Sequence, residues 1–248
     1  MIVRIMVVLG FGAGCLLLAA DEPKEKVRVS KTERIDFPSG GTLRLKNSIG
    51  VLTVEGWDQP EVEITTIKSS KDAYEARERK KAKRDLDRVR VTSERRGQEL
   101  VISTDFPRHR AILPNPAGGA INFDLEYRIK VPSAAQLMVT HDVGEVNVHN
   151  LTGNVDVTLL QGEIMLHLPE EGKYAINAKS DYGNVRSDFL GEEKRHRWWP
   201  VGHRVLNEDS GSAHTLNLKV GYGDIIILKT RVPKAPESLI PPPKTDRQ

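Results

Sequence analysis

The amino-acid sequence predicts an all-β protein whose short strands either stack as a β-helix-like solenoid or pack as a β-sandwich. A glycine followed by alternating apolar residues recurs along the chain, and one stretch alone, free of Gly and Pro, has the character of a helix. Glycine permits a tight turn, and the apolar residues two and four positions after it point to one side of a strand. Units this short cannot bury their apolar face alone, so they must stack or pair.

The composition excludes several other classes of protein. The 248 residues include 37 Lys and Arg against 34 Asp and Glu, and the mean hydropathy is -0.41. These values exclude a chain mostly embedded in a membrane and a strongly charged disordered chain. The single Cys excludes a disulfide framework and a multi-cysteine zinc site.

Residues 1–20 predict a signal peptide, and hence a protein that is exported to the periplasm or the cell surface. Arg4 precedes an uncharged apolar run that ends at Ala20, and a charged segment follows. The run has the length of a secretory signal and is short for a transmembrane helix, which needs about 20 apolar residues. Two alternatives are a retained anchor helix and a lipoprotein signal that ends at Cys15.

Residues 21–131 are expected to form an N-terminal β region with one inserted, charged surface helix over Lys71–Arg88. Alternation in Glu61–Ile67 is typical of a half-buried strand. The stretch Lys71–Arg90 holds nine basic and five acidic residues. The acids neutralise much of the field that phosphate binding requires, so the helix is expected to be solvated and nucleic acid is not expected as a partner.

Residues 132–230 are expected to form a β-repeat region, followed by a Pro-rich disordered tail over 231–248. A basic, Trp-containing insertion over 191–211 interrupts the repeat. The first three glycines of the region that open a repeat are nine residues apart, and an earlier copy lies in the N-terminal region. The copies begin at Gly50, Gly144, Gly153, Gly162, Gly183 and Gly223.

Two stretches resemble a known family: NSIGVLTVEGWDQPEVEITTIK (47–68) and YRIKVPSAAQLMVTHDVGEVNVHNLTGNVDVTLLQGEIML (127–166). Together with the charged helix they are similar to the bacterial DUF4097-type β-strand-repeat proteins, which are named for an adhesin domain. The resemblance covers most of residues 40–230. It implies a secreted or envelope-attached all-β protein, and it offers no catalytic residues to carry over.

Candidate ligand-binding residues lie in the basic segment 194–204. Arg195, Arg197, Trp198 and Trp199 combine indole rings with positive charge, which suits sugar stacking, cation–π contact or a membrane interface. The alternative is that both Trp cap one end of the β core, since stacked repeats need caps.

His149 and His167 each follow a repeat glycine by five residues. If one coil is 18 residues long, the two imidazoles occupy the same site on successive rungs, about 4.8 Å apart. They are the candidate pair for a metal ion, but because no third ligand accompanies them, neither a bound metal nor another cofactor is expected.

The expected function is that of a non-enzymatic, secreted or envelope-associated scaffold with an adhesin-like interaction surface. No nucleophile elbow, phosphate loop, HExxH or EF-hand pattern is present. One alternative is a periplasmic module that binds a glycan or a lipid through the 194–204 segment, and another is a carbohydrate-acting enzyme on a β-helix. The expected partners are an envelope glycan, a membrane surface or another protein.

Export predicts that intact-mass measurement of the mature protein gives a chain that starts at Asp21, because cleavage is expected after Ala20. A chain that starts at Cys15 with an added lipid mass would identify a lipoprotein instead. A chain that starts at Met1 would contradict both forms of processing.

Overall fold

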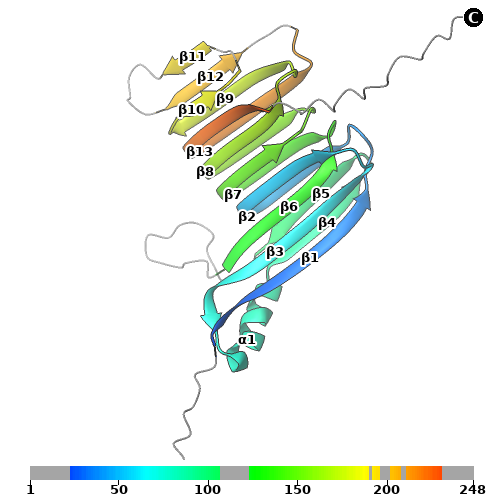
Figure 1. Ribbon diagram of the computed structural model, residues 1–248, viewed down its shortest axis with the longest axis vertical. Helices are drawn as coiled ribbons and strands as arrows, with labels where there is room; N and C mark the ends of the chain where they lie inside the picture. The colour runs from blue at the N-terminus through cyan, green and yellow to red at the C-terminus, as the bar shows by residue number, and fades with distance from the viewer. Residues whose placement is uncertain (1–22, 107–122, 190–191, 196–201, 208–210, 231–248) are drawn as a thin grey trace, which may run out of the picture.

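The computed structural model describes residues 23–106, 123–189, 192–195, 202–207 and 211–230. In this part of the chain a sheet of 13 strands carries one short helix, so the predicted all-β class is confirmed. The main path through the sheet runs β1-β3-β6-β2-β7-β8-β13-β9-β12-β11. Figure 1 shows these strands one above another, from β1 and the helix at the bottom to β11 at the top. No helix among the described residues is long and apolar enough to cross a membrane.

The strands vary from three to 17 residues, and the longest ones form the middle of the stack. In chain order the elements are β1 (Glu25–Asp36), β2 (Thr42–Trp57), β3 (Glu61–Tyr74), α1 (Ala76–Asp87), β4 (Arg90–Arg96), β5 (Glu99–Asp105), β6 (Phe123–Pro132), β7 (Gln136–His149), β8 (Val155–Pro169), β9 (Tyr174–Tyr182), β10 (Val185–Ser187), β11 (Glu192–Arg195), β12 (His203–Asn207) and β13 (His214–Thr230).

The four middle strands β2, β7, β8 and β13 are parallel, and their central glycines pair in register. Gly50 lies opposite Gly144, Gly144 opposite Gly162, and Gly162 opposite Gly223. The step from β7 to β8 is therefore the predicted coil of 18 residues. Gly153 has a different place from the other repeat glycines, because it lies in the turn that joins β7 to β8. This coil thus has two arms, with a bend at Gly144 and a turn at Gly153.

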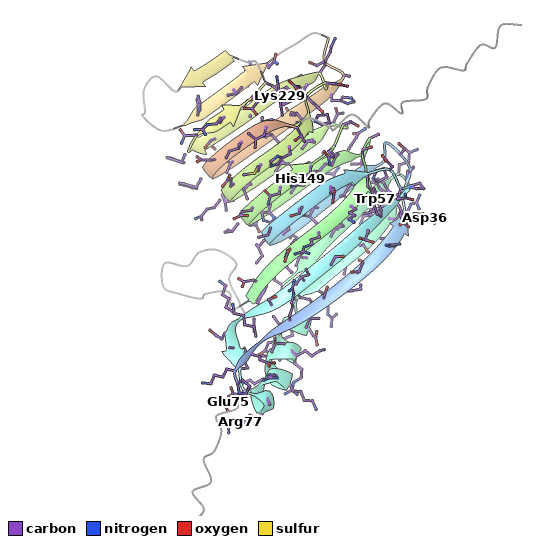
Figure 2. The ribbon with its side chains drawn as sticks, in the orientation of Figure 1. Asp36, Trp57, Glu75, Arg77, His149 and Lys229 are labelled. Atoms are coloured by element: carbon purple, nitrogen blue, oxygen red, sulfur yellow. The ribbon has the colours of Figure 1, made fainter. Side chains whose placement is uncertain are left out.

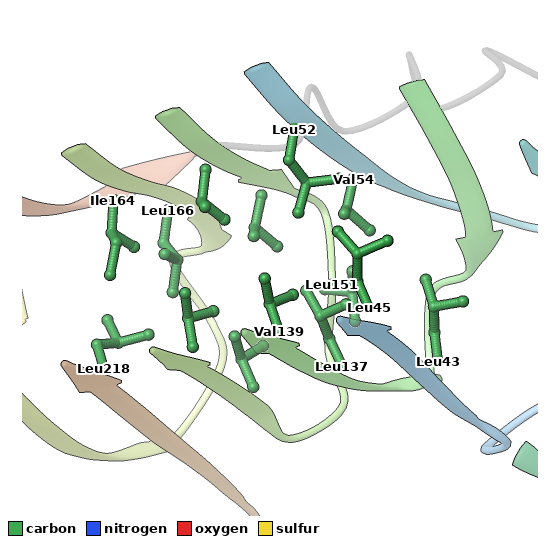
Figure 3. Close-up of a cluster of buried hydrophobic side chains, with 14 of the residues drawn as sticks. Leu43, Leu45, Leu52, Val54, Leu137, Val139, Leu151, Ile164, Leu166 and Leu218 are labelled. Atoms are coloured by element: carbon green, nitrogen blue, oxygen red, sulfur yellow. The ribbon is translucent and has the colours of Figure 1, made fainter. Parts of the chain in front are cut away.

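The core lies between the two sets of arms. Figure 3 shows Leu52 and Ile164 on one layer of arms, facing Leu137, Val139 and Leu218 on the other layer. All five side chains are at most 3% exposed. The period of two in each arm sends alternate apolar side chains into this layer and leaves polar ones outside, which is how repeats this short bury their apolar face.

The helix is shorter than the predicted stretch Lys71–Arg88. It begins at Ala76, because β3 continues to Tyr74, which pairs with Glu25 of β1. Pairing with a neighbouring strand overrides the local helix pattern at this point. Figure 2 labels Glu75 and Arg77 at the N-terminal end of the helix, where their side chains form an ion pair at 2.9 Å.

The helix contacts the rest of the protein through a narrow face. Ala82 and Leu86 are its buried residues. Lys68 Nζ donates hydrogen bonds to the carbonyl oxygens of Leu86 and Val89, at 3.2 and 2.8 Å, just where the helix ends. A cation at the negative end of the helix dipole stabilises it. The remaining faces are solvated, as the sequence predicts.

Strand β2 passes through Asn47 and Ser48 without a break, although Asn and Ser are common in turns. Asn47 adopts a left-handed conformation (φ 52°), which Asn tolerates, and the pairing with β7 shifts in register here. Ser48 Oγ donates to His141 Nδ1 at 2.6 Å, and His141 Nε2 donates to the carbonyl oxygen of Gly50 at 3.0 Å. The buried histidine thus ties the irregular part of β2 to the adjacent glycine bend.

Because the chain bends at the repeat glycines, we predict that Gly162→Ala prevents folding or destabilises the protein by more than about 3 kcal/mol. Gly162 has φ 137°, and a Cβ there would lie 1.7 Å from the carbonyl oxygen of Gly144. The control is Gly40→Ala: Gly40 has φ 80° and nothing within 4 Å of its Cβ position, so the loss is expected to stay at about 1–2 kcal/mol. Urea denaturation measures both, and equal losses would contradict the role of the close backbone contact.

Candidate functional site

Two exposed tyrosines stack on each other at the bend of β9 and β13. Tyr182 and Tyr222 lie opposite each other in register, with ring centroids 4.6 Å apart and planes 6° from parallel. They are 51% and 54% exposed, in a protein that buries most of its large apolar side chains. Exposed aromatic side chains of this kind offer contact area together with a polar hydroxyl group.

A row of cations crosses the same strands. Lys219 of β13 pairs in register with Lys179 of β9, which pairs in register with Arg204 of β12. Lys179 Nζ lies 2.5 Å from Asp181 Oδ1, and Arg204 donates from Nε and Nη2 to the neutral Asn177 Oδ1. Within the described residues Lys219 forms no ion pair. The row therefore holds more positive charge than its neighbours neutralise.

The tyrosines and the cations form one continuous surface, called here the tyrosine–lysine face: Lys179, Tyr182, Arg204, Lys219 and Tyr222. Each tyrosine lies three residues beyond a lysine on the same strand. All five residues are exposed, and their strands each pair with a neighbour on both sides. The face is thus held by paired backbone and not by a loop.

The sequence carries a signal for this face that the repeat pattern alone misses. Residues 179–183 and 219–223 both read Lys-x-x-Tyr-Gly, and each ends on a bend glycine. Because Tyr182 and Tyr222 directly precede bend glycines that lie side by side, alignment of the two copies on Gly183 and Gly223 would place the rings together. No pattern within either copy shows that the two strands are neighbours.

Of the four predicted ligand residues, Arg195 alone lies in the part of the chain that the structure describes. Arg195 is the last residue of β11 and pairs in register with His203, the first residue of β12. Arg197, Trp198 and Trp199 lie outside the described residues. The chain enters β12 at Gly202, whose Cβ position lies 3.0 Å from the carbonyl oxygen of Asp181, directly before Tyr182. The flanks of the predicted segment therefore adjoin the tyrosine–lysine face.

The predicted stacking of His149 and His167 is confirmed. The residues pair in register, and their rings stack with centroids 4.7 Å apart and planes 18° from parallel. His149 is the last residue of β7 and is labelled in Figure 2. Burial is the main cause that lowers the pKa of His149, and the neighbouring His167 lowers it further, while Glu55 opposes the shift. Among the described residues no group of three His, Cys, Asp or Glu side chains is placed to hold a metal ion.

Two further features carry polar groups that are buried or already paired within the protein. Ser48 and His141 resemble a nucleophile and its base, yet they are 0% and 1% exposed. A groove of about 330 Å³ lies between β1, β3, β4 and the end of α1. The half-buried ammonium group of Lys68 in this groove already donates to the carbonyl oxygens of Leu86 and Val89.

Comparisons with known proteins agree on family and fold. The model of the Toastrack DUF4097 family matches residues 62–228. The solved structure of a "putative cell adhesion protein" from Clostridium sporogenes is similar with a TM-score of 0.50 at 13% identity, over 82% of this chain and 100% of that one. A "putative adhesin" from Bacteroides fragilis gives a TM-score of 0.31 at 9% identity, over 81% and 97% of the two chains. No curated protein matches the chain.

The buried histidine predicts loss of stability in mild acid. Burial lowers the pKa of His141, and His149 shifts in the same direction. A histidine has a pKa of about 6.5 in the unfolded chain. When its pKa is lower in the folded protein, it stabilises the fold fully above pH 6.5, and this contribution is lost as the pH falls below that value. The free energy of unfolding is therefore expected to fall between pH 7.5 and pH 5.

The control variant is His141→Gln, whose amide keeps a donor for the Gly50 carbonyl oxygen but does not titrate. Urea denaturation at both pH values is expected to show a smaller pH dependence for this variant. A dependence as large as that of the wild type would contradict the assignment to His141.

Proposed function

Because the chain belongs to the Toastrack DUF4097 family, we propose that it is an exported, adhesin-like scaffold that acts by binding and not by catalysis. The apolar segment that ends at Ala20 supports export. The likeness to the fold of a protein named for cell adhesion is consistent with this role. Parallel rungs paired on both sides give a rigid surface on which exposed side chains keep fixed spacings.

The observation that carries the proposal is the stacked, half-exposed pair of Tyr182 and Tyr222. Two aromatic rings held in parallel on neighbouring strands are pre-organised, so a partner does not have to order them. Tyrosine supplies large contact area with few rotatable bonds, and its hydroxyl group remains available for hydrogen bonds.

The buried placement of the Ser48 and His141 pair favours binding over catalysis. A nucleophile and its base must meet the substrate, and neither side chain reaches solvent here. The described surface around the tyrosines offers aromatic and cationic groups without a nucleophile and base placed side by side.

Among the expected partners, an envelope glycan fits this surface best. Sugar rings pack their C–H faces on aromatic rings, and their hydroxyl groups pair with polar side chains. The related proposal, a glycan- or lipid-binding module that uses residues 194–204, gains support from the position of Arg195 and Gly202. These flanks adjoin the tyrosine–lysine face, so the segment and the face would act as one site.

Replacing both rings, in Tyr182→Ala/Tyr222→Ala, is expected to weaken binding to isolated cell-wall sacculi at least about fivefold, since each aromatic contact contributes about 0.5–1.5 kcal/mol. Co-sedimentation measures the loss, and phosphatidylglycerol liposomes serve as the lipid arm. The control is Val51→Ala, which removes an apolar side chain that is 36% exposed just after the bend glycine of β2. Unchanged binding to both sacculi and liposomes by the double variant would contradict a binding role for the tyrosine pair, and loss confined to liposomes would replace the glycan by a lipid.

A further inference from the structure

A charged row at the N-terminal end of the sheet alternates in sign. Register places four charged residues of neighbouring strands side by side, in the order Arg34, Glu63, Lys130 and Glu55. The guanidinium group of Arg34 lies 2.6 Å from the Glu63 carboxylate, and Lys130 Nζ lies 4.0 Å from it. Opposite charges on adjacent strands stabilise a sheet, so this row serves the fold.

The row that crosses the tyrosine–lysine face does not alternate. Lys219, Lys179 and Arg204 hold the same register position on three neighbouring strands, and the backbone register continues to Lys194 on β11. Like charges placed directly opposite each other destabilise a sheet. Because strands lie about 4.8 Å apart, the three cations span about 10 Å, and within the described residues Asp181 alone forms an ion pair with this row.

The tyrosines lie close enough to share a ligand with these cations. Each tyrosine is the third residue after its lysine, which is at most about 10 Å along a strand. A free anion would use the cations alone, and a neutral sugar would use the rings alone. A sugar that carries an acidic group uses both, since its ring packs on an aromatic side chain and its carboxylate pairs with ammonium or guanidinium groups.

Resting on the proposed glycan-binding role, we propose that the ligand of the tyrosine–lysine face is an anionic saccharide, a chain of sugars that carry carboxylate groups. The sugar rings lie against Tyr182 and Tyr222. The carboxylates face the row formed by Lys219, Lys179 and Arg204.

Acidic residues on the far side of the tyrosines give the ligand one orientation. Asp224 of β13 lies two residues beyond Tyr222, and it pairs in register with Glu163 of β8. These carboxylates repel the acidic groups of the saccharide, which therefore turn toward the lysine side. The surface thus supplies a matched pair of variants: loss of a positive charge should weaken binding, and loss of the negative charge on Glu163 should strengthen it.

The experiment compares oligogalacturonate with the same oligomer methyl-esterified, which keeps the rings and removes the charge. Isothermal titration of the full chain at low salt is expected to give tighter binding of oligogalacturonate. Lys179→Gln/Lys219→Gln should reduce that preference about fivefold, in line with the modest energies of exposed charge pairs, and added salt should do the same in the wild type. Glu163→Gln should raise the affinity for oligogalacturonate, and the melting temperature should not fall in either variant, since removing the two lysines relieves repulsion between neighbouring strands.

Equal binding of both oligomers that still requires the tyrosines would overturn the anionic ligand and leave the proposed glycan-binding role intact. If neither oligomer binds while sacculi bind through the tyrosines, the anionic saccharide is likewise overturned. Tighter binding of oligodeoxythymidylate than of oligogalacturonate would replace the saccharide by a single-stranded nucleic acid, because stacking and cations serve both. Binding to sacculi that is unaffected by replacing both tyrosines would instead overturn the proposed function itself.

Discussion

The stack of parallel strands depends on a contact between backbones at the bend glycines. A carbonyl oxygen of one strand occupies the space that a Cβ would fill on the glycine of the next strand. At Gly144, Gly162 and Gly223 a Cβ would lie only 1.7–1.8 Å from the glycine carbonyl oxygen of the neighbouring strand, and all three have φ between 134° and 137°. Glycine alone satisfies both conditions. The bend that results closes two arms on each other, and the apolar layer between them is the core of every coil.

The same bend decides which side chains share the outer surface. Because the bend glycines pair in register, the residues just before them pair in register as well, which brings Tyr182 and Tyr222 together. The lysines three residues earlier follow from the same alignment. The pairing of the bend glycines therefore also sets the spacing between the exposed side chains of the proposed binding surface.

The repeat pattern in the sequence was sufficient to predict the rung length and the stacking of His149 on His167, because both follow from the period between two bend glycines. It could not predict that β13 lies between β8 and β9, since the order of strands in a sheet depends on packing between distant segments. The tyrosine–lysine face spans β9 and β13, so it could not be predicted without knowing that these two strands are neighbours. The start of the helix at Ala76 escaped prediction for a related reason, because β1 extends β3 by pairing with it.

The face lies within the sheet, and this position allows its unusual charge. Strand β9 is paired with β13 and β12, and β13 with β8 and β9, so ladder hydrogen bonds on both sides hold the register against repulsion among the lysines. Repulsion within the row lowers the stability of the free protein, and an anionic ligand that neutralises the row relieves this repulsion. Two rings and three cations make a small contact area, and a single site of this size binds weakly. Repeated contact between a polymer and many copies of the protein multiplies such weak affinity, which is how adhesion can rest on so small a face.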